Sequence, residues 1–332
     1  MSSKIYRDNS LDILKGFGIL TMIMGHSNMG ESFNLYIAGF HMQLFFLVSG
    51  YLFNAKKYEL KNFIKRKTQS LLYPYVTFAI ITILYCLLIS LLKDENVYDF
   101  PNYLLGVIYS NRSIFPITGA LWFLQCLFIV SVLFWFISRC KKWIGNSLIC
   151  MFFILAYLQS YYDLWLPFAL DSALSAIIFF FIGFKLQKFK RNLPLSFNKS
   201  LASGILLIIL TGISIYFNGP VNPRTCTYNN YILYYINAII ATLGWYFISY
   251  LLTNHSKIGD YLSIMGKDSI VFVGLNQLII TSLYQGFNLI YQFDSLIERA
   301  TRNIFICVFT IIFLVWTTRI ISNSKYKVFI GK

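Results

Sequence analysis

Three ionisable side chains, Lys15, His26 and His41, stand inside two neighbouring apolar stretches near the start of the sequence. Ionisable groups are costly in hydrocarbon, so within a membrane they are functional candidates by default. Lys15 and His26 are eleven positions apart, which on an α-helix is three turns plus about 20°, and about 16 Å along the axis. The spacing predicts one helix face with a cation at one end and an imidazole at the other.

His41 follows the short turn between the two stretches, and His26 and His41 are nearly equidistant from that turn. They are therefore expected at similar depth on adjacent helices, where a neutral imidazole suits the role of general base. The alternative is that these groups only bridge helices by hydrogen bonds, and Lys15 also has the options of reaching the surface or pairing with Asp12. Two histidines at one depth, above a lysine on the same face, favour a functional site.

The composition indicates which elements position these groups. The 332 residues are 57% hydrophobic and only 12% charged, against about 25% charged in an ordinary soluble domain. Apolar spans are expected near 13–29, 35–54, 72–92, 117–138, 143–160, 170–187, 201–217, 231–252, 269–290 and 303–322. Since a spanning helix takes about 20 residues, these use most of the chain. The expected fold is an all-α integral membrane bundle of about ten transmembrane helices, one domain over residues 1–332 with no soluble domain.

The net charge of +15 is distributed by connection. Basic residues gather in alternate segments, at 4–7, 56–67, 139–142, 185–199, 257–267 and 319–332, whereas the other connections hold only Lys93, Arg112, Arg224, Arg299 and Arg302. This alternation predicts that both termini are cytoplasmic, in the cytoplasmic (inner) membrane of the cell. The charge is thus a topology signal, and no nucleic-acid partner is expected. The six cysteines lack the close spacing of a metal or redox site, so no metal is expected.

Two connections and several polar positions add detail. Residues 56–71 mix basic and apolar side chains, as in a helix that lies in the membrane surface. Residues 94–116 contain an apolar stretch too short to span, which predicts a re-entrant or interfacial piece on the outer face. Trp122 falls near the outer end of the fourth span, where a belt aromatic is also common. The later spans hold the polar residues Gln125, Asn237, Asn276 and Gln277, which also fit simple bridging between helices.

Six segments in chain order resemble the acyltransferase 3 family of multi-spanning acyltransferases, in particular its fucose 4-O-acetylase-like branch of sugar O-acetyltransferases. They are LDILKGFGILTMIMGH (11–26), FHMQLFFLVSGYLF (40–53), FIKRKTQSLLYPY (63–75), GALWFLQCLF (119–128), LPFALDSALSAIIFFFIGFKLQK (166–188) and LSIMGKDSIVF (262–272). The first two segments are the most specific, and together the six cover most of the chain.

The resemblance implies an acetyl-CoA-dependent O-acyltransferase that acts on a sugar hydroxyl of a cell-surface glycan or its lipid-linked precursor. Acetyl-CoA is then a co-substrate, with no bound cofactor. By the same resemblance His26 is catalytic, and Lys15, in place of the usual arginine, belongs to the donor site. The basic pair before the third span matches Arg66 and Lys67 as donor-binding residues, with Ser70 where a further arginine is common.

His41 is assigned with His26 to catalysis, to orient it or to stabilise the oxyanion, and Trp122 and Asn276 are assigned to the acceptor side. Direct transfer and an acyl-histidine intermediate are both open, as are acyl groups larger than acetyl. The rival interpretation is a proton-coupled secondary transporter or a glycolipid flippase, which also needs buried ionisable groups. The concentration of polar groups near the N-terminus, rather than over two repeats, favours the enzyme.

Overall fold

A computed structural model describes residues 8–54, 56–93, 100–109, 120–187, 196–253 and 257–331. Within them every regular element is a helix, apart from one isolated bridge between Asn222 and Thr227, so the all-α prediction is confirmed. Several positions used in the topology and surface predictions lie outside the described residues: 4–7, 94–99, 110–116, 188–195 and Lys332.

Eight segments of the described chain are long and apolar enough to cross a membrane. They are α2–α3 (Glu31–Ala38 and His41–Tyr51), α4–η1–α5 (Leu60–Lys67, Thr68–Leu72, Tyr73–Lys93), α8 (Lys142–Tyr161), η2–α9 (Pro167–Ala169, Leu170–Leu186), α10 (Phe197–Asn218), α11 (Tyr231–Leu251), α13 (Ser269–Ile290) and α14 (Leu296–Ser322). The other two predicted spans correspond to α1 (Asn9–His26), which carries two charged residues, and to the shorter apolar α7 (Trp122–Ile137). The chain is a multi-pass membrane protein; the count of ten and the cytoplasmic termini stay predictions.

The second predicted span, 35–54, is divided into α2 and α3 at Gly39 and Phe40. Gly39 lies against Ile215 of α10 so closely that a Cβ there would collide with its side chain. Packing against α10 thus sets the direction of α2, and α3 begins afresh at His41. The predicted surface helix 56–71 is helical as α4 and η1 and runs on into α5, and the short outer apolar stretch forms α6 (Phe100–Tyr109).

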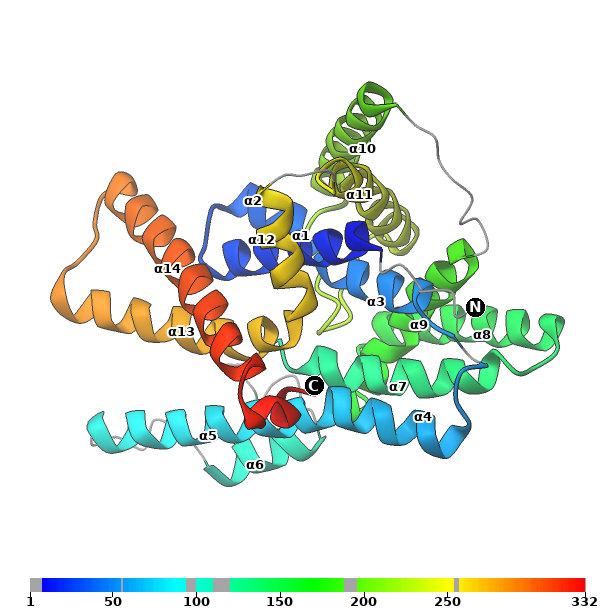
Figure 1. Ribbon diagram of the computed structural model, residues 1–332, viewed down its shortest axis with the longest axis horizontal. Coiled ribbons are helices and arrows are strands. Elements are labelled where there is room, and N and C mark those ends of the chain that lie inside the picture. The colour runs from blue at the N-terminus through cyan, green and yellow to red at the C-terminus, as the bar shows by residue number, and fades with distance from the viewer. Residues whose placement is uncertain are drawn as a thin grey trace.

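Helix α1 lies at the centre of the molecule, in contact with α3, α11, α12 and α13, while α13–α14, α10–α11 and α5–α6 flank it (Figure 1). Its closest neighbour is α12 (Lys257–Lys267), a stretch that the sequence predicts only as a basic connection. A Cβ at Gly16 would collide with Leu262 O, and one at Gly266 with Asp12 O, so glycines let the two backbones touch. The close fit fixes α1, and with it Lys15 and His26.

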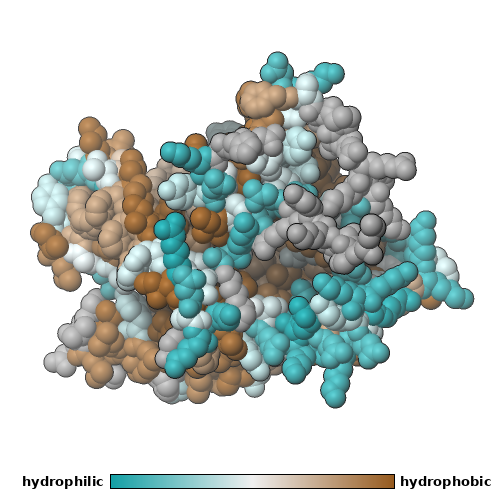
Figure 2. All heavy atoms as spheres, viewed as in Figure 1, coloured by the Kyte–Doolittle hydropathy of each residue, from teal (hydrophilic) through white to brown (hydrophobic). Residues whose placement is uncertain are grey.

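Hydrogen bonds join predicted inner connections to each other and predicted outer connections to each other. Tyr58 O accepts from Trp135 Nε1 (3.4 Å) and Arg139 Nη2 (3.3 Å), which joins two predicted inner connections. Ser160 Oγ donates to Cys226 O (2.6 Å), which joins two predicted outer ones. Figure 2 shows hydrophilic side chains over α4 and the α7–α8 turn, and hydrophobic side chains over α13–α14 and α5–α6. The grouping agrees with the alternation of basic connections.

Candidate active site

His26 is the last residue of α1, and Asn276 of α13 holds its ring. His26 Nδ1 lies 2.5 Å from Asn276 Oδ1. The amide nitrogen of Asn276 is already engaged, because Nδ2 donates to Phe272 O (2.7 Å) and Val273 O (3.0 Å) of the preceding turn. These two bonds orient the fully buried amide with Oδ1 toward the imidazole, so Oδ1 accepts and Nδ1 carries the proton. A neutral ring in this tautomer keeps its lone pair on Nε2.

Gln277, the next residue of α13, faces that lone pair. Its Nε2 lies 3.4 Å from His26 Nε2, and its Oε1 accepts from the Ala120 N–H at 3.3 Å. The bond to Ala120 orients the amide with its NH₂ group toward the imidazole. Because 3.4 Å is long for an N–H···N hydrogen bond, Nε2 stays accessible to a better partner. Ala120 is two residues before the start of α7, so Gln277 also brings Trp122 into the neighbourhood of His26.

The turn after His26 is tied to α13 and α14. The Tyr284 hydroxyl lies 2.9 Å from both Ser27 O and Asn303 Oδ1, and Asn303 Nδ2 donates to Asn28 O at 2.9 Å. Tyr284 belongs to α13, the helix that also supplies Asn276, and Asn303 belongs to α14. Together they hold the backbone that follows His26. The position of the imidazole is therefore determined at both its backbone and its ring.

His41 begins α3, and α1 and α3 pack together, as expected for histidines on adjacent helices. Its Nδ1 donates to Ile37 O at 2.7 Å. Trp122 is buried, with its ring edge-on to Phe123 at 6.5 Å between centroids. Phe123 in turn packs edge-on against Phe45 of α3 (5.6 Å). The starts of α3 and α7 thus meet beside α1, where the Phe45 ring lies against Gly18.

Lys15 forms an ion pair with Asp12 at 2.8 Å, one of the two alternatives for a lysine at this position. Asp12 is buried and the Lys15 side chain is 18% exposed. The lysine lies outside the lining of the basic cavity described next. Of the three predicted donor residues, Arg66 and Lys67 line that cavity and Lys15 does not.

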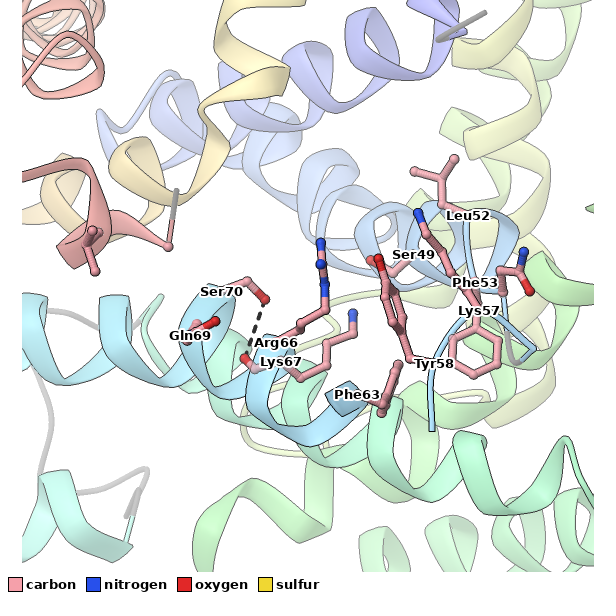
Figure 3. A pocket seen from close by; sticks show the side chains of 13 residues that line it. Ser49, Leu52, Phe53, Lys57, Tyr58, Phe63, Arg66, Lys67, Gln69 and Ser70 are labelled. Atoms are coloured by element: carbon pink, nitrogen blue, oxygen red, sulfur yellow. Dashed lines mark hydrogen bonds between the residues drawn. The ribbon is translucent and has the colours of Figure 1, made fainter. Parts of the chain in front are cut away.

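A cavity of about 670 Å³ lies between the end of α3 and the α4–η1 segment (Figure 3). Its lining consists of Ser49, Leu52, Phe53, Asn54, Lys57, Tyr58, Phe63, Arg66, Lys67, Gln69, Ser70, Val328 and Gly331. Three of these described residues are cationic and none is acidic, a balance that suits an anionic ligand. We name it the donor cavity, after the predicted donor residues Arg66 and Lys67 in its lining.

Aromatic rings hold the cations of the donor cavity. The Arg66 guanidinium lies 4.6 Å from the centroid of the Tyr58 ring, and Lys57 Nζ lies 5.4 Å from the same ring. Lys67 Nζ lies 5.8 Å from the Phe63 ring. Such contacts orient a cation without neutralising it. Figure 3 shows the Arg66, Lys67 and Lys57 side chains extending into the space between α4 and α3.

The sequence analysis assigned Asn276 to the acceptor side and named Gln277 only as a polar position, and it gave no site role to Lys57 or Tyr58. The sequence did contain a signal for Lys57 and Tyr58, since the two residues lie just before the basic helix. It contained no signal for the pairing of His26 with Asn276, because these residues are 250 positions apart. Among the described residues, no three metal-ligating side chains come together.

The comparisons with known proteins define the class. A family model described as an acyltransferase domain, acyltransferase 3, matches residues 8–319. The chain therefore belongs to the acyltransferase 3 family, as its motifs indicate, and is a membrane acyltransferase. No curated protein and no solved structure matches it. The fucose 4-O-acetylase-like branch stays a prediction.

Proposed function

We propose that the protein transfers an acetyl or other short acyl group from acyl-CoA to a sugar hydroxyl of a cell-surface glycan or its lipid-linked precursor. The observation that carries the proposal is the His26 ring, whose Nδ1 proton is held by Asn276 and whose Nε2 lone pair is accessible. A neutral imidazole in this tautomer is ready to accept a proton from an alcohol. The family supplies the reaction class, acyl transfer.

In the proposed reaction His26 Nε2 takes the proton of the acceptor hydroxyl while its oxygen attacks the thioester carbonyl carbon. A C–O bond forms, and the tetrahedral intermediate then breaks the C–S bond. The departing CoA sulfur receives the proton from His26 Nε2, which restores the neutral ring. Asn276 keeps Nδ1 protonated throughout, so that one nitrogen serves both proton transfers. His41 supports this step by orienting His26 or stabilising the oxyanion.

The donor cavity is proposed to bind the phosphates of CoA through Lys57, Arg66 and Lys67. Helix α3 connects this cavity to the catalytic end, because Ser49 lines the cavity and His41 begins the helix. The eight helical steps from His41 to Ser49 span about 12 Å, a distance that an extended pantetheine arm covers. The arm would run beside α3 and deliver the thioester to His26. Lys15 then serves the donor only indirectly, from α1.

The acceptor is proposed to approach from the side of Trp122, the predicted acceptor residue that begins α7. Asn276 is reassigned from the acceptor side to the positioning of His26. Its side chain is fully buried, and both of its polar atoms are engaged by His26 and by its own helix. It has no group left to offer a sugar.

The test is transfer of label from acetyl-CoA to isolated surface glycan by the purified protein, together with glycan mass analysis of a deletion strain. The proposal expects labelled glycan, and a loss of one acyl mass in the deletion strain. Transport of a lipid-linked sugar with no acyl transfer would instead support the carrier, which the family match disfavours.

We also propose that both termini face the cytoplasm, as the alternation of basic connections indicates. Reporters fused near Lys142 and after Lys332 should then read as cytoplasmic, and one near Asn222 as external. An external reading after Lys332 would place the donor cavity on the wrong side for CoA.

A further inference from the structure

The chain returns to the donor cavity after its last long helix. Beyond α14 it forms the short helix η4 (Lys325–Ile330), which packs against α5 and α14. In Figure 1 this red segment lies beside the junction of α4 and α5. Ile330 is 4% exposed, whereas its neighbours Val328 and Phe329 are 52% and 55% exposed. The buried side chain of Ile330 thus anchors the segment.

Gly331 brings the segment into contact with the turn η1. Its φ is +77°, a conformation that L side chains rarely adopt. A Cβ at this position would lie 2.8 Å from Ser70 Cα and 2.9 Å from Ser70 O. Both the conformation and the approach therefore require glycine here. The contact falls on a π-helical turn, a local geometry that is frequent at functional sites.

The same residues face the donor cavity. Val328 and Gly331 line it together with Gln69 and Ser70 of η1, while the cations come from α4 and from the segment before it. Val328 and Gly331 therefore form a part of the cavity wall that the C-terminal segment supplies, next to η1. Without this wall a bound nucleotide would contact the protein on fewer sides.

We propose that residues 325–331 complete the acyl-CoA site, with Ile330 as anchor and Gly331 as the residue that seats the segment on Ser70. The inference rests on the proposed function, because it takes the donor cavity to be the CoA site. Loss of the wall removes contacts that donor and transition state share, so it raises the donor KM and leaves kcat nearly unchanged.

The experiment compares CoA binding and acetyl-CoA kinetics of the purified full chain in three variants of this segment and in Arg66→Ala. Gly331→Val breaks the seating through strain and collision, and Ile330→Asp removes the anchor. Phe329→Ala is the matched control, since this exposed neighbour lies outside the cavity lining. We expect the first two to raise the Kd for CoA about tenfold, a loss of about 1.4 kcal/mol. Phe329→Ala should bind CoA as the parent does.

The fourth variant, Arg66→Ala, separates the claim that the donor cavity binds CoA from the claim that residues 325–331 complete the site. If it weakens CoA binding while Gly331→Val and Ile330→Asp do not, the wall is refuted and the donor cavity stands. If none of the three changes CoA binding, the donor cavity itself is refuted. If Gly331→Val or Ile330→Asp fails to fold, CoA binding is measured on folded Gly331→Ala instead. This variant keeps the backbone strain and adds the smallest side chain. Unchanged binding in that variant contradicts the proposal.

Discussion

The two halves of the site are built in opposite ways. The neutral, buried amide of Asn276 on α13 holds the imidazole of His26, whereas cations that lie over aromatic rings line the donor cavity. An isolated carboxylate beside His26 would be expensive to bury, and an amide orients the ring without adding charge. A CoA phosphate needs countercharge more than fixed geometry. Changes near His26 should therefore lower kcat, and changes in the cavity should raise the donor KM.

The largest effect is expected for His26→Gln. The variant can still donate a hydrogen bond to Asn276, but an amide cannot accept the hydroxyl proton at neutral pH. Transfer per mole of folded protein should fall by about 10²–10⁴ while CoA binding is kept. His41→Gln is the control and should be less severe. Near-normal turnover in His26→Gln would leave His26 as only a bridge between helices.

A smaller loss is expected for Asn276→Leu, which fills similar space but offers no acceptor to Nδ1–H. The ring is then free to take the other tautomer, with Nε2–H toward the substrate, so kcat should fall about tenfold to a hundredfold, less than on removal of the base. The donor KM should not change. Asn276→Asp, which keeps an acceptor oxygen, should be more active than Asn276→Leu. Equal rates in the two variants would mean that Asn276 only packs.

In the donor cavity, Arg66→Ala and Lys67→Ala should each raise the KM for acetyl-CoA about tenfold, since a charged hydrogen bond contributes about 1.5–3 kcal/mol. Turnover at saturating donor should stay within about twofold. Lys65→Ala is the matched control, because this exposed lysine of α4 does not line the cavity. A fall in kcat alone would contradict the division between the two regions.

The smallest effect is expected for Lys15, which does not line the donor cavity. Its ion pair with Asp12 suggests a structural contribution, so Lys15→Ala should raise the donor KM by less than about tenfold and lower the Tm. Lys15→Arg should keep most activity. Asp12→Asn in the Lys15→Ala background should recover part of the Tm, because it removes the buried charge. If Lys15→Ala raises the donor KM as much as Arg66→Ala does, Lys15 binds the donor directly and the structural explanation is wrong.

Local periodicity was enough to place half of the proposed catalytic centre. The spacing of Lys15, His26 and His41 depends only on helix geometry and one short turn, and in the structure His26 ends α1 and His41 begins α3, two helices that pack together. The pairing of Lys15 with Asp12 was likewise visible at helical spacing, as one of two alternatives.

The other half depends on packing between distant segments. Asn276 meets His26 because α13 packs on α1, and the rotation of α13 about its axis cannot be read from a nearly uniform apolar stretch. The break between α2 and α3 has a similar cause, the close approach of Gly39 to Ile215. The packing of helix α12 against α1 was not predicted, because the basic residues of α12 indicate a connection between spans. Its glycines, which let it approach α1, carry no such signal in the sequence.

The central claim is that His26 is a neutral imidazole with its proton on Nδ1, and ¹⁵N nuclear magnetic resonance of histidine-labelled protein tests it directly. The chain has three histidines, His26, His41 and His255, so the spectrum is simple, and His26→Gln and His41→Gln assign the signals. At neutral pH without substrate, we expect the His26 signals of a ring protonated at Nδ1 and unprotonated at Nε2. In Asn276→Leu this preference should be lost. A doubly protonated ring, or a proton on Nε2, in the parent protein would contradict the account.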